Sequence, residues 1–181
     1  MDYQIADRSY KNNREKALSK NSRFQIIYDG LYATTPVFLA AFLGNYATLP
    51  NLTKWYALLI PPPFTPPNWL FGPVWTLLYI LMALSFFRII RLDPMKPERS
   101  LAIRIFLGQI LLNASWSFAF FSAHNPFAGL LIILTLEMLI LWSIFIFNKL
   151  DRIAARCLWP YAAWVAYASY LNFGFWLLNK S

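Results

Sequence analysis

The sequence predicts an all-α integral membrane protein, a bundle of five transmembrane helices, and composition is the first reason. Of its 181 residues, 59% are hydrophobic and 19% aromatic, and only 13% are charged. An ordinary soluble domain carries about 25% charged residues and far fewer aromatic ones. The second reason is a series of almost uncharged stretches, each long enough for the roughly 20 apolar residues that cross a bilayer. A disordered chain, a nucleic-acid-binding module and almost every compact soluble enzyme are thereby excluded, and the length suits one domain.

Taken in order, the chain begins with a polar, basic N-terminal extension, residues 1–30, expected to be flexible or to lie on a surface. A membrane domain, residues 31–181, follows. Its helices are predicted near residues 31–50, 68–90, 99–122, 126–148 and 155–178. Residues 51–67 form a loop because proline cannot continue a helix interior, and five prolines lie between positions 61 and 67. The third and fourth helices are divided by a polar turn that ends at Pro126.

Basic residues lie almost entirely on one side of this arrangement. The extension, the second connection and the fourth connection hold all of the 16 lysines and arginines except Lys54 and Lys180. The positive-inside rule therefore places the N-terminus in the cytoplasm and the C-terminus outside, which favours a bacterial inner membrane. The net charge of +8 is assigned to topology and to contact with membrane lipids, and no nucleic-acid partner is predicted.

Metal or cofactor chemistry is not expected from these residue types. The chain has one cysteine, Cys157, and one histidine, His124, too few for a disulfide or for a Cys/His metal site. Glu137 is the one acid inside a predicted span. Such a residue is either functional or protonated and hydrogen-bonded within the bundle, and Asn113 or Ser143 is the expected partner in the second case.

The stretch from Trp55 to Tyr79 holds the strongest candidates for a binding site. Trp75 and Tyr79 are four residues apart and share one helix face. Trp75 lies about 9 Å deeper than Trp69 at 1.5 Å per residue, which is too deep for an interfacial belt of aromatic residues. An interfacial belt therefore does not account for Trp75. The stiff, apolar, proline-rich loop before it is expected to lie over the mouth of the bundle.

Three motifs on three predicted helices make the chain resemble the translocator protein family, also called tryptophan-rich sensory proteins or peripheral-type benzodiazepine receptors. The first motif is carried by Trp55, Tyr56, Pro61, Pro63, Pro66, Pro67, Trp69, Gly72, Pro73, Val74, Trp75, Leu78 and Tyr79. The second is carried by Gln109, Asn113, Trp116, Phe120 and Phe121. The third is carried by Pro160, Tyr161, Trp164, Tyr167, Ala168, Leu171 and Asn172.

The resemblance implies a five-helix bundle that binds a porphyrin or a similar planar apolar ligand beneath its first loop. The ligand-binding residues it implies are Tyr56, Trp75, Asn113, Trp116, Ser117, Trp164, Ala168 and Leu171, with Trp55, Pro61, Pro63, Pro66 and Pro67 in the lid loop. Relatives also occur in outer membranes, so that location stays open. A homodimer is open too, although Gly108 has Arg104 and Leu112 at the four-residue spacing where relatives place small residues.

Three functions share such a cavity. A receptor or regulator of tetrapyrrole metabolism is preferred. A light-dependent protoporphyrin-degrading enzyme would use Trp75 and Trp164 as catalytic residues. A porphyrin or sterol transporter is the weakest alternative, since Glu137 is the one acid in the spans and no inverted repeat is visible. Sterol is further disfavoured because the first basic residue after Tyr170 is Lys180, too distant for the family's sterol motif.

Overall fold

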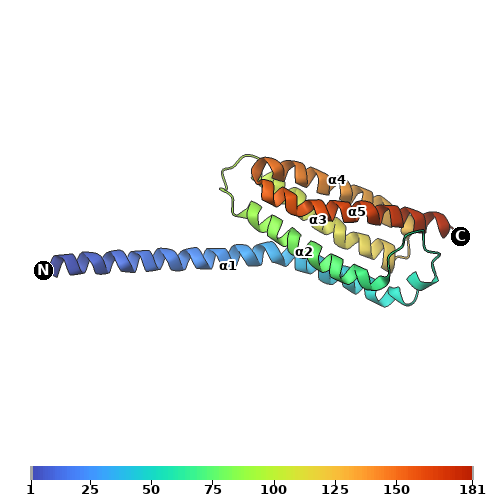
Figure 1. Cartoon of the computed structure of the whole chain (residues 1–181), viewed down its shortest axis with the longest axis horizontal. Coiled ribbons are helices and arrows are strands. Elements are labelled where there is room, and N and C mark those ends of the chain that lie inside the picture. Colours follow the sequence, from blue (N-terminus) through green and yellow to red (C-terminus); the bar gives the residue numbers. More distant parts are fainter. Residues whose placement is uncertain (1, 181) are drawn as a thin grey trace.

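The computed structural model describes the backbone of residues 2–180 and the side chains of residues 24–180. Five long helices make up the protein, and no strand occurs in the described chain (Figure 1). Their bounds are α1 Asp2–Leu52, α2 Asn68–Ile90, α3 Arg99–Ser117, α4 Pro126–Leu150 and α5 Arg152–Leu178. Two short segments accompany them, a 3₁₀ turn η1 at Tyr56–Leu58 and a π-helical turn η2 at Phe118–Ser122 that continues α3.

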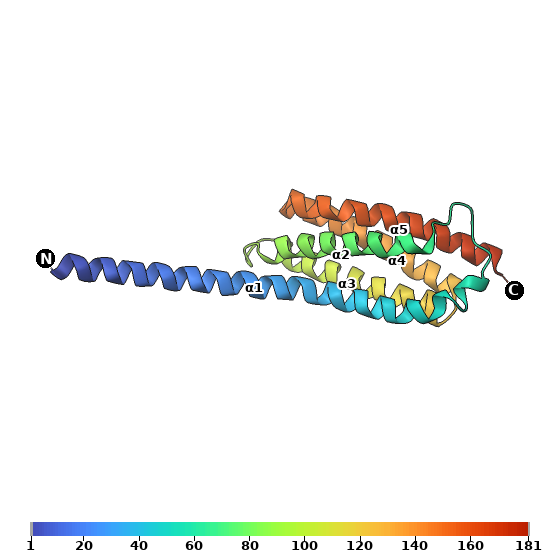
Figure 2. The ribbon, with the colours of Figure 1, turned by 60° about the horizontal axis from the view of Figure 1, so that its bottom comes forward.

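Helix α1 corrects the predicted start of the first helix near residue 31. The helix begins at Asp2, and its N-terminal part projects well beyond the other helices (Figures 1 and 2). The extension was expected to be separate because it is polar, yet it contains neither proline nor glycine before Gly30. Since lysine, glutamate, arginine and alanine are good helix formers, nothing local ends the helix there. A polar composition shows where α1 leaves the membrane domain, but it does not end the helix.

The other helices begin where the sequence supplies a cap or a break. Pro67 precedes α2 in an extended conformation, and Pro126 occupies the first turn of α4, where its missing N–H is no loss. The Asn125 side chain accepts a hydrogen bond from the backbone N–H of Ala128 at 2.9 Å. Asp151 likewise accepts from Ile153 and Ala154 at 2.8 and 2.9 Å, which starts α5 directly after α4.

The helices pack in the ring order α1, α2, α5, α4, α3, with α3 closing on α1. Four segments are long and apolar enough to cross a membrane: Phe24–Leu52, Asn68–Ile90, Arg99–Ser122 and Pro126–Leu150. α5 is also long, at 27 residues, and packs along α4 and α2. The chain is therefore a multi-pass membrane protein with a helical bundle, as its composition predicts.

One half of the bundle is solid. We call it the basic end, the end that carries the connection 91–98 and the turn at Asp151. There Phe86, Phe106 and Phe147 are fully buried and stack, with ring centroids 4.3 Å apart for the first pair and 6.1 Å for the second. The opposite end, which carries residues 53–67 and the C-terminus, is called the lid end. Because large rings fill the basic end, any sizeable cavity must lie toward the lid end.

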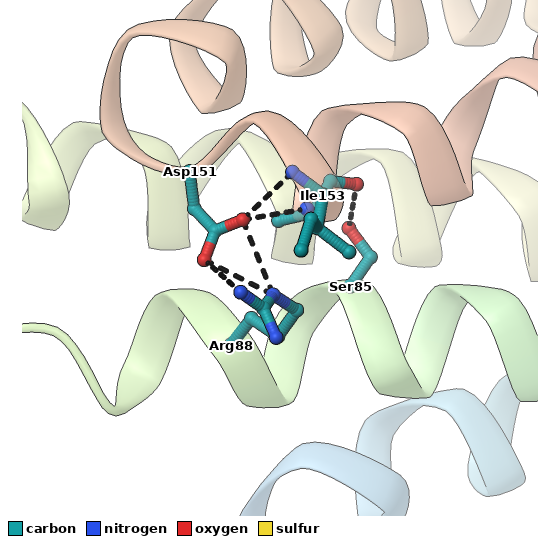
Figure 3. A network of polar contacts seen from close by, with 5 residues as sticks. Ser85, Arg88, Asp151 and Ile153 are labelled. Carbon is teal, nitrogen blue, oxygen red and sulfur yellow. Dashed lines mark hydrogen bonds and ion pairs between the residues drawn. The ribbon is translucent and has the colours of Figure 1, made fainter.

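A polar clamp joins α2 to the start of α5 at the basic end (Figure 3). Arg88 Nε donates to both carboxylate oxygens of Asp151 at 3.1 and 3.0 Å, and its Nη2 lies 2.8 Å from Oδ2. One turn deeper, the buried Ser85 hydroxyl donates to the carbonyl of Ala154 at 2.7 Å. The carboxylate that caps α5 is thus also the group that holds α2 beside it.

Candidate ligand-binding site

A cavity of about 800 Å³ extends from the lid end to beyond the middle of the bundle, as far as Thr34 of α1 and Ala83 of α2. Its walls come from α1, α2, α3 with η2, and α5, while η1 contributes Tyr56. No described residue of α4 lines it. Its size falls within the roughly 300–1,000 Å³ typical of small-molecule sites, and most of its surface is apolar or aromatic.

The structure brings together seven of the eight ligand-binding residues predicted from the sequence. These are Tyr56, Trp75, Asn113, Trp116, Ser117, Ala168 and Leu171, and all of them line the cavity. They come from η1, α2, α3 and α5, so only the tertiary structure makes them neighbours. Trp75 and Tyr79 share a face as expected, with ring centroids 5.3 Å apart and the rings stacked. Both belong to the α2 wall.

Trp164 is the exception, because it does not line the cavity. Its indole packs edge-on against Phe71, a lining residue, with ring centroids 5.8 Å apart, and it also contacts Tyr167 at 5.7 Å. The indole Nε1 is buried and has no hydrogen-bond partner among the described residues. Trp164 therefore touches the cavity wall through Phe71 without being part of it.

The polar groups of the cavity form a network centred on Asn113. The Tyr79 hydroxyl donates to Asn113 Oδ1 at 3.2 Å, and Asn113 Nδ2 donates to the hydroxyl of the fully buried Tyr161 at 3.0 Å. A second pair lies nearer the lid, where Trp116 Nε1 donates to Asn172 Oδ1 at 2.8 Å. These bonds tie α2, α3 and α5 together around the cavity and hold its neutral polar atoms in place.

The hydrogen bond predicted from Glu137 to Asn113 or Ser143 is not formed. Asn113 bonds to Tyr79 and Tyr161, and the Ser143 hydroxyl donates to the carbonyl of Leu139 at 2.8 Å. Glu137 Oε2 is buried without a hydrogen-bond partner among the described residues. Glu137 does not line the cavity.

Aromatic rings close the cavity toward the lid end. Tyr56 packs against Phe120, Phe121 and Phe175 with centroid distances of 6.4, 5.6 and 5.2 Å. Burial raises the pKa of the Tyr56 phenol, which therefore stays neutral at physiological pH. Phe120 and Phe121 lie in the π-helical turn η2, whose wider winding displaces them from the α-helical positions expected for residues 99–122. Such turns occur often at functional sites.

The proline-rich loop is fixed mainly to α5. The hydroxyls of Tyr167 and Tyr170 donate to the carbonyls of Phe64 and Pro63 at 2.6 and 3.1 Å. Asn179 exchanges two hydrogen bonds with the backbone of Ile60, at 2.9 and 3.1 Å. Loop residues thus bond to α5 from Tyr167 to Asn179, and only Tyr56 reaches the large cavity from the loop.

The predicted lid residues lie around this attachment rather than in the cavity wall. Trp55 stacks on His124 at 4.6 Å and meets Phe120 edge-on at 5.5 Å. Pro61 lines a smaller neighbouring pocket of about 280 Å³. Pro66 is half-buried and Pro67 precedes α2. The buried proline of the loop is Pro62, which the sequence did not single out; it lies against Gly174, where an added Cβ would come within 2.5 Å of the Pro62 Cβ.

The cavity opens sideways between α1 and α2. Phe38 and Leu49 of α1 line it and are still 68% and 61% exposed. Trp69 and Ile80 of α2 line it and are 71% and 60% exposed. Residues that line the cavity and are also exposed on the outside of the bundle mark an opening. Because these side chains are apolar, the opening is compatible with the apolar interior of a membrane.

The α1 wall is the part of the site that sequence reasoning missed. It is built from residues at helical spacing, chiefly Thr34, Ala41, Gly44, Asn45, Thr48 and Leu52. Gly44 allows a close approach, because a Cβ there would lie 3.3 Å from Ser117 Oγ. The available signal was the three-to-four-residue spacing of Thr34, Ala41, Gly44, Asn45 and Thr48, which places these small and polar residues on one helix face.

Comparison with known proteins identifies the family of the chain. The model of the TspO/MBR family matches residues 32–177. The chain is 40% identical over 143 residues to the tryptophan-rich protein TspO of Archaeoglobus fulgidus, which covers 79% of this chain and 92% of that protein. It is 36% identical over 138 residues to the tryptophan-rich protein TspO of Chlorobaculum tepidum, covering 76% and 87%. Identity to the human translocator protein is 30% over 142 residues, covering 78% and 84%. The chain therefore belongs to the TspO/MBR family.

Proposed function

We propose that this protein binds a flat, apolar ligand, a porphyrin or related tetrapyrrole, and acts as a receptor or regulator of tetrapyrrole metabolism. The observation that carries the proposal is the cavity of about 800 Å³ with Tyr56, Trp75 and Trp116 in its wall. Flat aromatic faces stack on a planar ligand, and each such pair contributes about 0.5–1.5 kcal/mol beyond burial. The opening between α1 and α2 offers such a molecule an apolar route of entry.

The proposal is tested by titrating the detergent-purified protein with protoporphyrin and following tryptophan fluorescence in darkness. We expect saturable quenching, and Trp75→Phe should weaken the affinity about three- to tenfold because a stacking surface becomes smaller. Trp164→Phe is the matched control, since Trp164 packs on Phe71 and does not line the cavity. Quenching no greater than that of a detergent blank would overturn the proposal.

Light-dependent degradation of the bound porphyrin is a second candidate, and it rests on Trp75. Trp75 lines the cavity and stacks on Tyr79 at 5.3 Å, so one tryptophan of the predicted pair stands where a ligand would contact it. Illumination of the loaded protein should then give a new absorbing product in the wild type and none in Trp75→Phe. Equal product yield in both proteins would refute the enzymatic proposal without affecting the proposal that the protein binds a porphyrin.

We further propose that all five helices span a bacterial inner membrane with the N-terminus in the cytoplasm. The distribution of charge supports this orientation, because the described arginines and lysines of residues 88–104 and 149–156 gather at the basic end. The 27 residues of α5 give it a length of about 40 Å, enough for a bilayer. Its place in the ring between α2 and α4 supports a span beside theirs.

A further inference from the structure

The described lining residues of the cavity include no side chain that is charged near neutral pH. None of its described lining residues is Asp, Glu, Lys, Arg or His, and its polar groups are neutral amides, hydroxyls and indoles. An ionised carboxylate enclosed there would lose its hydration without gaining a counter-charge, which is costly. A flat ligand that carries acidic groups must therefore keep those groups outside the wall, at an edge of the cavity that offers positive charge.

Two lysines of the described chain lie at the lid end, Lys54 and Lys180. The ammonium of Lys180 lies 3.8 Å from the ring centroid of Trp176, and Trp176 packs against Phe127 of α4. Because no described α4 residue lines the cavity, this contact keeps Lys180 on the far side of α5.

Lys54 occupies a different position, in the short turn between α1 and η1. Leu52 on one side of it and Tyr56 on the other both line the cavity, and its neighbour Trp55 packs on the lining residue Phe120 at 5.5 Å. Lys54 itself is exposed. A strongly hydrated ammonium on a flexible four-carbon stem can thus reach the cavity edge while remaining in water.

Building on the proposed function, we propose that Lys54 is a specificity-determining residue that pairs with an acidic group of the ligand at the lid-end edge of the cavity. The flat apolar body lies among the aromatic walls, and the carboxylate stays in water beside the Lys54 ammonium. In this arrangement the neutral wall contacts only the apolar body of the ligand, and the carboxylate keeps both its hydration and a counter-charge. The pairing also determines that the acidic edge of the ligand points toward the lid.

The test compares protoporphyrin, which has two free carboxylates, with its dimethyl ester, which has none. Both are titrated against the wild type, Lys54→Gln, Lys54→Arg and Lys180→Gln at low ionic strength, and each variant is compared with the wild type for the same ligand, so that partition into detergent cancels. We expect Lys54→Gln to lower the affinity for the free acid about three- to fivefold, which is the effect of losing an exposed ion pair, and to leave the affinity for the ester unchanged. Lys54→Arg should bind the acid as tightly as the wild type does, and Lys180→Gln should bind both ligands as the wild type does.

Salt provides a second readout of the same pairing. Raising the ionic strength from about 0.02 to 0.2 M should lower the affinity of the wild type for the free acid, because salt screens a charge pair. The affinity of Lys54→Gln for the free acid should not change, because that variant lacks the pair. The assignment would be overturned if Lys54→Gln lowered the affinities for acid and ester equally, or if it left the affinity for the acid unchanged. It would also be overturned if Lys54→Gln and Lys180→Gln changed the affinity for the acid by the same amount. Binding of neither ligand to the wild type would instead refute the proposed function itself.

Discussion

At the scale of single residues, Gly174 determines how the proline-rich loop lies on α5. An added Cβ at Gly174 would approach Pro62 Cβ and Cγ to 2.5 and 2.9 Å, so the loop must shift. We expect Gly174→Ala to lower stability by about 1–3 kcal/mol and to weaken protoporphyrin binding, because Tyr56 belongs to the same loop. Thermal unfolding in detergent and the fluorescence titration measure both effects. Gly30→Ala is the control, because nothing lies within 4 Å of a Cβ there.

Asn113 is the second residue with a defined role, since it links hydroxyls from two other helices. Asn113→Leu should destabilise the protein by about 1–3 kcal/mol, because the fully buried Tyr161 hydroxyl then has no partner at 3.0 Å. The double variant Asn113→Leu/Tyr161→Phe removes that orphaned hydroxyl and should recover part of the loss in a thermal unfolding assay. An additive or larger loss in the double variant would contradict this account.

At the scale of elements, the clamp between α2 and α5 makes part of the stability depend on pH. Burial alone would raise the pKa of Asp151, but the bonds from Arg88, Ala154 and Ile153 outweigh it and hold the pKa below its usual value of 3.8. A carboxyl whose folded pKa is depressed contributes stability that is complete above its unfolded pKa and is lost as the pH falls through the folded one. The contribution is therefore full near neutral pH and declines as the pH falls below about 4, toward the depressed pKa of folded Asp151.

Asp151→Asn isolates this contribution, because asparagine can still cap α5 but cannot pair as a charge with Arg88. We expect the variant to be about 1 kcal/mol less stable than the wild type at pH 7, with a smaller difference at pH 3. Thermal unfolding at both pH values measures the difference. A gap of the same size at pH 3 would show that the charge pair is not its source.

At the scale of the whole molecule, the proposed orientation puts the basic end and the lid end on opposite sides of the membrane. Met95, between α2 and α3, and Leu58, in the lid-end loop, are 87% and 82% exposed. After Cys157→Ala, an impermeant thiol reagent added outside intact cells should label Leu58→Cys and label Met95→Cys only after permeabilisation. Labelling of both positions from the same side would refute the arrangement.

The helical class and four of the five helix starts could be predicted from local features, whereas most of the candidate site residues came from the resemblance of three motifs to a known family. Prolines, caps and uncharged stretches act within a few residues of where they stand, so residues 68, 99 and 126 were correct as helix starts, and residue 155 was close to the actual start at Arg152. The start of α1 was wrong because a polar segment without proline or glycine continues a helix as readily as an apolar one. The motif residues of η1, α2, α3 and α5 were expected to meet in a ligand site, and seven of eight do line one cavity.

What the sequence determined by itself is therefore the membrane class and the order of the helices, because each depends on composition or on near neighbours; the candidate ligand residues came from the resemblance of three motifs to a known family. The tertiary structure decided the rest. It left Trp164 outside the cavity wall, made α1 one of the walls and seated Pro62 on Gly174. These outcomes depend on side-chain volumes packed across different helices, and no local pattern in the chain records which rings fill a space and which lie behind them.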